Sequence, residues 1–375
     1  MAVNRRASYR SFAGQPTEIL GHFFGLPPGE KLLLCSDRSI EVSDRRQSSA
    51  KVNMVRVLLT TCCPNWPMIR QTPKRLGVWE DYEFVIDQPG SVCDAWVVFD
   101  NLGETISATC APENLFFVSA EPPEIRKYRR DFLNQFRWVV TCHETRHRGL
   151  IAAQQGHPWH VGVDADRGFI ATLDYDALSA MDVPDKPHVL STVISSKAIT
   201  PAHRQRLAFV KQLKERLGDR FHVYGRGHQS IADKWEAVAP YRFHLAMENA
   251  SRPDYLTEKV CDAFLGSSYP FYFGAPNAGS YFPKHSFEPI DIFQPEQAIE
   301  KICAAIDSQV DMRRRDEVQQ ARRIVLDELN LFAMLVRLLR QKLVDRPKRR
   351  LRLYPKGQHL QLAMSGVGRF LRRAA

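Results

Sequence analysis

The chain has 375 residues, of which 44% are hydrophobic and 25% are charged. This length and balance exclude general disorder and allow two domains, each with its own core. The sequence holds no run of about 20 apolar residues, the length that a membrane-spanning helix needs, and its first residues lack the apolar core of a secretory signal. We therefore expect a cytoplasmic protein.

The formal net charge of +10 is concentrated near the carboxyl terminus. Residues 346–375 contain nine Lys and Arg residues and no Asp or Glu, so the rest of the chain is close to neutral. A nucleic-acid-binding domain would instead spread basic residues over a folded face, among aromatic side chains. We expect no nucleic-acid partner and keep that function as a distant alternative. The tail also contains Leu and Phe, which would suit an anionic membrane surface; a solvated tail or an oligomerisation segment is the alternative.

Residues 1–50 form an amino-terminal extension to which we assign no role. From residue 51 the pattern changes to short apolar runs rich in Val and aromatic residues, typical of strands buried on both faces. The stretches between these runs are compatible with helices, so residues 51–165 predict a Rossmann-like βα domain. The expected strands are residues 54–61, 82–86, 94–99, 114–120 and 136–142.

A second alternation of strands and helices follows a crossover at 144–187, so residues 166–310 predict a second Rossmann-like domain that faces the first across a cleft. Its expected strands are residues 188–195, 222–225, 241–247 and 269–274, and its helices begin near Pro201 and Tyr255. The last segment, 311–375, predicts one long helix at 312–344 and then a helical, basic, amphipathic tail.

The segment from 254 to 266 carries the clearest chemical signal. Leu256, Val260 and Phe264 recur at helical spacing after an apolar strand, and the first turn holds Glu258 and Lys259. A helix amino terminus exposes unpaired N–H groups and partial positive charge, so a nearby lysine makes it a seat for a pyrophosphate. Glu258 could accept hydrogen bonds from a ribose or sugar diol. The alternative is that Glu258 complements the helix dipole and Lys259 is a solvated charge.

Around this helix, the run FHLAMENASRPDYLTEKVCDAFLGSSYPFYFGAPN, followed by YFPKHSF at 281–287, resembles a known signature. It is similar to the donor-binding region of glycosyltransferase family 10, the α-1,3/4-fucosyltransferases, in their bacterial form. The family pattern runs F-x-L-x-F-E-N, Y-x-T-E-K, P-x-Y-x-G and Y/F-x-P-x-S-F in this order. Met247 stands where the family usually has Phe, an apolar exchange that should matter little. The resemblance implies a GT-B-like α/β fold and GDP-fucose as the donor.

The resemblance also implies a set of donor-binding residues. The segment SSKAITPAHRQRLAFVKQL resembles the one in which the family places an arginine on the donor phosphates, and its spacing selects Arg206 over Arg204. Glu248, within the Glu-Asn pair, is a weaker candidate. The implied donor-binding residues are Arg206, Asn249, Tyr255, Glu258 and Lys259.

The catalytic base is expected in the first domain. The segment NLFFVSAEPPEI resembles the one that carries the family's general base, with Glu121 as the matching carboxylate and Glu124 as its rival. Glu121 lies at the carboxyl end of a predicted strand, where α/β sheets place ligands, and the two prolines stiffen the loop after it. Three crossover residues, His157, Trp159 and His160, are weaker candidates that could line the cleft; exposed loop histidines and a core tryptophan are the alternative.

Two Asp-x-Asp triplets, at 164–166 and 174–176, could in principle bind a metal and a sugar nucleotide. Such triplets of common residues arise easily by chance. Fixed cations at Arg206 and Lys259 would stabilise the departing diphosphate without a metal. We therefore expect no metal site and no required cofactor.

Together these observations predict an inverting, metal-independent glycosyltransferase. The predicted reaction moves L-fucose from GDP-β-L-fucose to a hydroxyl, with O3 favoured, of an N-acetylglucosamine-containing glycan such as that of a lipopolysaccharide. A transferase of the same fold that uses another GDP-sugar is the alternative. The expected location is the cytoplasm, with a peripheral position at the inner face of a bacterial membrane if the tail at 346–375 binds anionic lipids.

Overall fold

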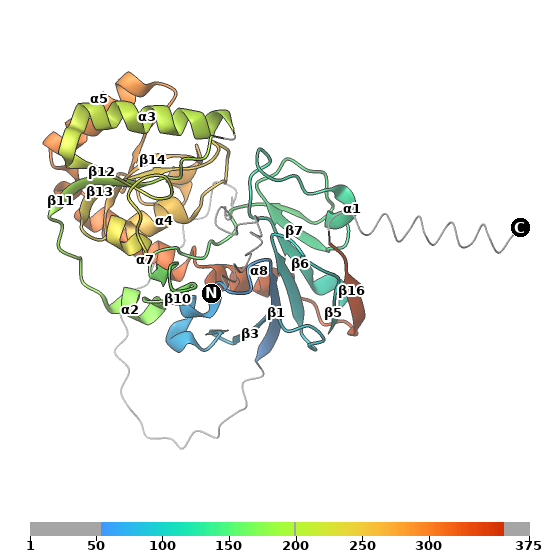
Figure 1. Ribbon diagram of the computed structural model, residues 1–375. Helices are drawn as coiled ribbons and strands as arrows, with labels where there is room; N and C mark the ends of the chain where they lie inside the picture. Colours follow the sequence, from blue (N-terminus) through green and yellow to red (C-terminus); the bar gives the residue numbers. More distant parts are fainter. Residues whose placement is uncertain (1–53, 199, 356–375) are drawn as a thin grey trace, which may run out of the picture.

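The computed structural model describes residues 54–198 and 200–355, whose two larger sheets are mainly parallel and each have their own helices (Figure 1). The expected extension at 1–50 and the end of the basic tail, 356–375, lie outside the described residues. Within the described ranges no helix is long and apolar enough to cross a membrane.

The first domain is built on a sheet whose strands follow the order β2-β3-β1-β4-β6-β7-β8. All of its pairings are parallel except the one between β2 and β3. The five expected strands are present, and consecutive residues such as Val57, Leu58 and Leu59 are fully buried because both faces of the sheet are covered. The strands are β1 Val55–Thr61, β2 Val78–Trp79, β3 Tyr82–Ile86, β4 Ala95–Phe99, β6 Leu115–Val118, β7 Trp138–Thr141 and β8 Leu150–Ala152.

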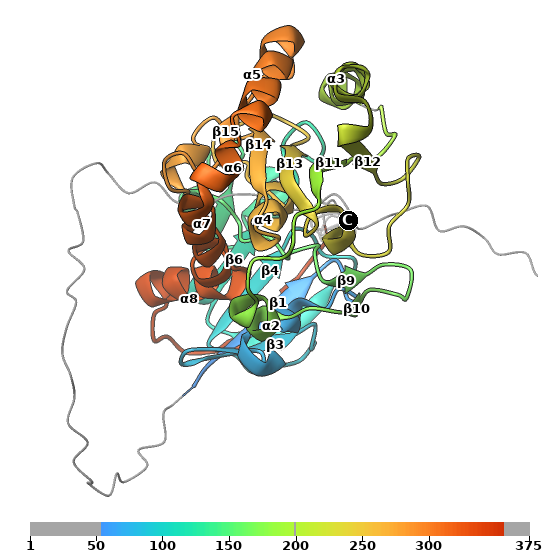
Figure 2. The same ribbon diagram turned by 90° about the vertical axis from the view of Figure 1, so that its left-hand side faces the viewer.

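The second domain contains a parallel sheet of order β12-β11-β13-β14-β15. The four expected strands are present. Helix α3 contacts α5. Helix α4 packs beside α7 (Figure 2). The elements are β11 His188–Val193, α3 Pro201–Leu217, β12 Phe221–Tyr224, β13 Tyr241–Met247, α4 Glu258–Leu265, β14 Tyr269–Phe273, β15 Glu288–Pro289 and α5 Pro295–Asp307.

Shorter elements complete both domains. Between the sheets, a β9–β10 hairpin and α2 occupy the crossover, and the 3-10 helix η5 precedes β13. Their bounds are α1 Arg130–Leu133, β9 Val163–Asp164, β10 Ile170–Ala171, α2 Tyr175–Ala180 and η5 Lys234–Ala237; the remaining 3-10 helices are η1 Met68–Gln71, η2 Pro73–Arg75, η3 Pro112–Asn114, η4 Gly218–Arg220 and η6 Ala278–Ser280.

The prediction of one long helix at 312–344 is wrong. The segment forms α6 Val310–Arg313, α7 Arg315–Asp327 and α8 Leu331–Lys342, and the side chain of Asn330 accepts a hydrogen bond from Phe332 N at 3.0 Å to begin α8. The apolar side of α7 belongs to the core of the second domain, whereas α8 is buried in the core of the first. One straight helix could not reach both cores, so the chain turns between them.

The described part of the tail, 346–355, is not helical. It contains β16 Arg349–Leu353, which pairs antiparallel with β5 Ile106–Cys110. Leu353 is buried in the first domain, and Lys348 forms an ion pair of 2.6 Å with Asp94. The carboxyl-terminal segment is therefore packed onto the first domain through α8 and β16 and does not form a separate unit in the described range.

The crossover is held where it passes α8. Gly156 has a φ of +58°, and a Cβ at this position would lie 2.7 Å from the Cα of Leu331. Any larger residue would therefore be strained and would also push the two backbones apart. This close contact places the following residues, including His157 and His160, beside the second domain.

Candidate functional site

A cavity of about 290 Å³ opens at the carboxyl ends of three neighbouring strands of the second sheet. Its walls include Lys197 after β11, Arg226 after β12 and Asn249 after β13. β11 pairs with both β12 and β13, so the strand order reverses at this point of the sheet. Such switch points are where open α/β sheets bind ligands.

The structure brings four of the predicted donor-binding residues to this cavity. Tyr255 does not line it; its side chain is completely buried in the turn before α4. Of the weaker candidates, His160 is also in the wall. The predicted residues that line the cavity are Arg206, Asn249, Glu258 and Lys259.

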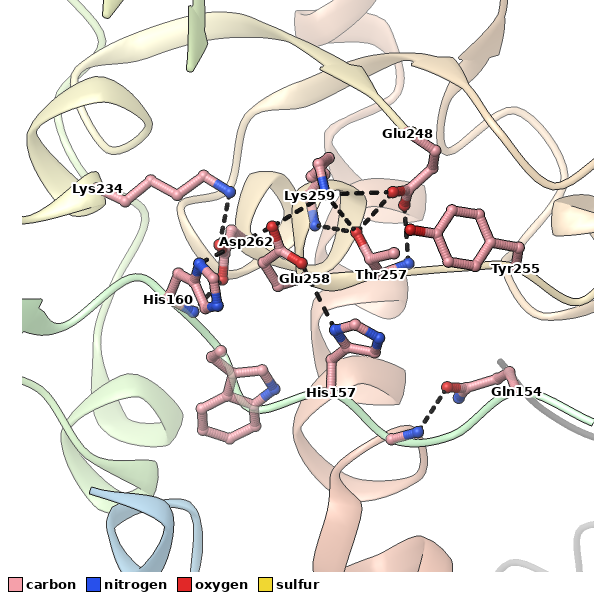
Figure 3. Close-up of polar contacts among 12 residues, drawn as sticks. Gln154, His157, His160, Lys234, Glu248, Tyr255, Thr257, Glu258, Lys259 and Asp262 are labelled. Carbon is pink, nitrogen blue, oxygen red and sulfur yellow. Dashed lines mark hydrogen bonds and ion pairs between the residues drawn. The ribbon is translucent and has the colours of Figure 1, made fainter. Parts of the chain in front are cut away.

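The amino terminus of α4 is built by a short polar network (Figure 3). The helix begins at Glu258 and not near Tyr255, because the Thr257 hydroxyl caps it by accepting from Lys259 N at 3.3 Å. Glu248, fully buried at the end of β13, accepts from Thr257 N at 2.8 Å and from its hydroxyl at 2.7 Å. Lys259 Nζ lies 3.4 Å from Glu248 and 3.2 Å from Glu258. Glu248 therefore braces the turn that carries Glu258 and Lys259.

Glu258 is a buried carboxylate surrounded by basic groups. Its oxygens lie 3.5 Å from Nδ1 of His157 and 3.8 Å from Nδ1 of His160. Burial would raise the pKa of Glu258, but Lys259, His160, Lys234 and His157 hold that pKa below its usual range. Burial also lowers the pKa of both histidines, so at pH 7 the positive charge beside Glu258 comes from Lys259 and Lys234. Glu258 is therefore an ionised hydrogen-bond acceptor, suited to hold a diol.

The arginine that the spacing selected lies in the cavity wall. Arg206 is 4% exposed, and its Nη1 donates to the carbonyl oxygen of Met247 at 3.0 Å, which holds the guanidinium at the end of β13. Arg204 is exposed on the same helix and donates to Ala198 O. The geometry thus places Arg206, and not Arg204, beside the start of α4.

The side-chain amide of Asn249 is buried and has no hydrogen-bond partner among the described residues. The residue is 1% exposed, and this holds for both its amide oxygen and its amide nitrogen. A buried amide left in this state costs about 1–3 kcal/mol per unsatisfied group. Because Asn249 lines the cavity, a bound ligand that both donates and accepts would satisfy it.

The sequence analysis did not identify several cationic residues that line the cavity. Lys197 and Arg226 follow strands β11 and β12, and that position was the signal that could have found them. Lys234 comes from η5, and its Nζ lies 2.8 Å from Asp262 on α4. Asp262 also accepts from the backbone N of His160 at 3.1 Å, so it ties the crossover to the helix. Its spacing of four residues from Glu258 marks the same helix face.

The predicted base, Glu121, lies after β6 and is 3% exposed. Its backbone oxygen is 2.7 Å from Nε2 of His143. The pKa of the Tyr255 phenol is raised by burial, by Glu248 and then by Glu121, so Glu121 lies near Tyr255 of the second domain. Its rival Glu124 is instead paired with Arg252 at 2.6 Å, in a salt bridge that joins the two domains.

The remaining weaker candidate, Trp159, is a core residue. It is 1% exposed within the core of the second domain, and its backbone N donates to Gln71 at 2.8 Å. The structure therefore places Trp159 in the packing between crossover and domain, away from the cavity walls.

A further polar cluster on the first domain was not foreseen. Asp100 follows β4 in a left-handed conformation with φ of +69° and is fully buried. Its carboxylate accepts hydrogen bonds from Tyr128 and Arg126, and from Sγ of Cys62 at 3.4 Å. These groups follow the carboxyl ends of β1, β4 and β6, so this edge of the first sheet is also polar.

The two Asp-x-Asp triplets have structural contacts. Asp164 accepts from Arg167 N at 3.0 Å; Asp174 caps α2 through Ala177 N at 2.9 Å. Asp176 accepts from Lys74 N at 2.5 Å. Among the described residues, no group of three or more His, Cys, Asp or Glu side chains is arranged to hold a metal ion.

The cavity lies in a region that also matches a known family. Residues 183–315 match the family model described as glycosyltransferase family 10 (fucosyltransferase) C-term. The match covers less than half of the chain. The resemblance to the fucosyltransferases of family 10 is thus confirmed over these residues, and the two facing βα domains agree with the GT-B-like fold that it implies.

Curated relatives carry fucosyltransferase names. The chain is 27% identical over 120 residues to a putative fucosyltransferase-like protein of Arabidopsis thaliana, which covers 32% of this chain and 23% of the relative. It is 28% identical over 131 residues to 4-galactosyl-N-acetylglucosaminide 3-alpha-L-fucosyltransferase 9 of Mus musculus and of Homo sapiens, covering 34% of this chain and 35% of each relative. The matches thus span about a quarter to a third of these relatives' lengths.

Solved structures align with a larger share of the chain at lower sequence identity. An alpha1,3-fucosyltransferase with GDP-fucose aligns at a TM-score of 0.46 and 16% identity, covering 81% of this chain and 94% of that chain. A structure of TarM aligns at a TM-score of 0.40 and 10% identity, covering 66% and 55%.

Proposed function

We propose that this protein is an inverting fucosyltransferase that uses GDP-β-L-fucose. The observation that carries the proposal is the cavity beside the family-matched region, whose walls include Lys259 in the first turn of α4 and Arg206, held at the end of β13. Two fixed cations and the amino terminus of a helix form a binding site for a nucleoside diphosphate. Glu258 beside them is ionised and suited to accept hydrogen bonds from sugar or ribose hydroxyls.

The proposed reaction is a single displacement. Glu121 takes the proton of the acceptor hydroxyl as the new bond forms from its oxygen to the anomeric carbon. The bond from that carbon to the β-phosphate oxygen breaks on the opposite side, and GDP departs with the electron pair. Lys259, Arg206 and the N–H groups of α4 stabilise the charge that develops on the diphosphate. One base suffices, as in inverting glycosidases, because no covalent intermediate forms.

We infer an N-acetylglucosamine-containing glycan as the acceptor and its O3 as the attacking hydroxyl. The support is the name of the mammalian relatives, which specifies a 3-alpha-L-fucosyltransferase acting on a 4-galactosyl-N-acetylglucosaminide. The polar carboxyl edge of the first sheet, with Glu121, is where this acceptor would lie. A bacterial surface glycan such as that of a lipopolysaccharide would suit a cytoplasmic enzyme.

A transferase for another GDP-sugar is the second candidate, because the diphosphate seat contacts a part that all GDP-sugars share. The test is to incubate the protein with GDP-fucose, GDP-mannose and UDP-N-acetylglucosamine and to measure the nucleotide released. We expect release from GDP-fucose at a rate at least tenfold above the others. Faster release from GDP-mannose would favour the second candidate, and no turnover or binding of any GDP-sugar would overturn both.

We also propose a peripheral position at the cytoplasmic face of a membrane. Exposed Arg349, Arg350 and Arg352 on β16 lead into the remaining basic residues of 346–375 and would attract anionic lipids. Removal of residues 356–375 keeps β16 intact. We expect the shortened protein to sediment less with phosphatidylglycerol vesicles than the full chain does; equal sedimentation would contradict this role for the tail.

A further inference from the structure

A second cavity, of about 440 Å³, lies in the second domain and has no role in the proposed transfer. It opens at the amino ends of β13 and β14, beside Arg242 and Tyr269, whereas the donor cavity lies at the carboxyl ends of the same sheet. Its other walls are the segment at 183–186 and the neighbouring turns of α6 and α7. Figure 2 shows α6 and α7 in succession along this side of the domain.

Basic side chains outnumber acidic ones in the lining of this cavity. Arg242 is paired bidentately with Asp311 at 2.9 and 2.6 Å, which neutralises both. Asp185 is exposed and accepts from the backbone N of Lys186. Lys186 Nζ donates to Ala239 O, Gly266 O and Ser268 Oγ, and burial lowers the pKa of this lysine to about 7. With Arg315 at the start of α7, the lining carries three basic side chains and two carboxylates.

Two polar atoms in the lining are buried and lack partners among the described residues. They are the hydroxyl of Ser267, a residue that is 9% exposed, and Nε2 of Gln319. Both can donate a hydrogen bond. In addition, the thirteen-residue helix α7 has no side-chain cap at its start, and Arg315, Val318 and Gln319 of this helix line the cavity. The acidic residues of its first turn, Asp316 and Glu317, are not in the lining.

Hydrogen-bond donors, basic side chains and an uncapped helix amino terminus all favour an anionic ligand. We propose that this cavity binds a phosphorylated small molecule. Its phosphate would accept from Ser267 and Gln319 and pair with Arg315 near the start of α7. The non-phosphate part would lie on the apolar side of the cavity, formed by Val183, Pro184, Met312 and Val318. The volume is in the range of small-molecule sites and larger than a phosphate ion needs.

Ribose 5-phosphate is the probe, and its binding to the full-length protein is measured by calorimetry and by the shift in Tm at matched ionic strength. We expect binding to the wild type and at least a tenfold loss in R315E and in Q319L. R323E is the matched control, because Arg323 lies exposed on the same helix outside the cavity. Its affinity should equal that of the wild type.

Lys259→Ala separates this proposal from the proposed function, since it alters the donor cavity alone. Unchanged ribose 5-phosphate binding in this variant supports the second site, even if no GDP-sugar is ever turned over. Loss of binding in Lys259→Ala would locate the probe in the donor cavity and overturn the proposal. Equal affinity in wild type, R315E and Q319L, or no binding to the wild type, would also overturn it.

Discussion

Lys259 is the lysine that we assign to the proposed leaving group. Its Nζ lies within 3.4 Å of both Glu248 and Glu258 and faces the cavity. We expect Lys259→Ala to lower the rate of GDP release from GDP-fucose by about 10²-fold or more, because a fixed cation at the developing charge is lost. The control is Lys211→Ala, which removes an exposed lysine from α3. Full activity in Lys259→Ala would remove this residue from the mechanism.

The choice of base can be tested on two carboxylates three residues apart. Glu121→Gln should lower transfer by about 10²-fold to 10⁴-fold while leaving GDP affinity unchanged, because general-base catalysis contributes in this range. Glu124→Gln is the matched control, because it makes the same chemical change on the rival carboxylate. This variant removes the charge that pairs with Arg252 between the domains. Initial rates and calorimetric GDP binding distinguish them. A large loss in Glu124→Gln together with normal rates in Glu121→Gln would reverse the assignment.

The Asp-x-Asp triplets make a separate prediction about metals. Asp174 and Asp176 already accept hydrogen bonds from backbone groups, and Asp174 also pairs with Arg75 at 2.5 Å. We expect the transfer rate to be the same after dialysis against EDTA as after addition of Mg²⁺ or Mn²⁺. A rate that falls at least tenfold on chelation and returns with the metal would contradict the metal-independent mechanism.

At the scale of elements, the start of α4 depends on the two hydrogen bonds that Thr257 donates to Glu248, which we call the brace. Thr257→Val removes the helix cap, which costs about 0.5–2 kcal/mol of stability, and leaves buried Glu248 without its hydroxyl partner. We expect both a lower Tm and at least tenfold weaker GDP binding, since the N–H groups of α4 would no longer be held in place. Asp174→Ala, which uncaps α2 outside the cavity, should lower Tm but leave GDP affinity unchanged. Unaltered GDP affinity in Thr257→Val would contradict the role given to the brace.

The sequence predicted the central strands correctly, because their burial is a local pattern. It failed on the carboxyl-terminal helix, because the break in that helix depends on the positions of the two domains. A run such as 241–247 is apolar on both faces, so its burial is visible in the sequence itself. The helical pattern at 312–344 is equally clear, but it does not show that α7 and α8 belong to different cores. Their separation at Asn330 depends on where the two domains lie.

At the scale of the whole molecule, buried neutral histidines predict sensitivity to acid. Burial lowers the pKa of His244 to about 3, and it lowers the pKa of His157 and His160 as well. The unfolded chain binds these protons below about pH 6.5 and the folded chain does not, so stability is full above that pH and falls as the pH decreases. His244 alone should cost about 2 kcal/mol between pH 6.5 and pH 5.

The measurement is the free energy of unfolding by urea at pH 7.5, 6.5, 5.5 and 5.0. We expect His244→Gln to show a weaker pH dependence than the wild type, even if it is less stable at pH 7.5 through loss of the contact with Ser191. His228→Gln is the control, because His228 is exposed. An identical pH dependence in wild type and His244→Gln would contradict the assignment.

The sequence by itself determined the local elements that form the candidate site of the second domain. The strands of the second domain, the helix after 254, and the Glu258–Lys259 pair are local patterns, in which the chemistry and the spacing lie within a few tens of residues. Only the tertiary structure decided which distant residues join them. Lys197, Arg226 and Lys234 enter the cavity from separate elements, and Glu124 is taken by Arg252 of the other domain. Such contacts depend on the packing of whole elements, and no local periodicity records that packing.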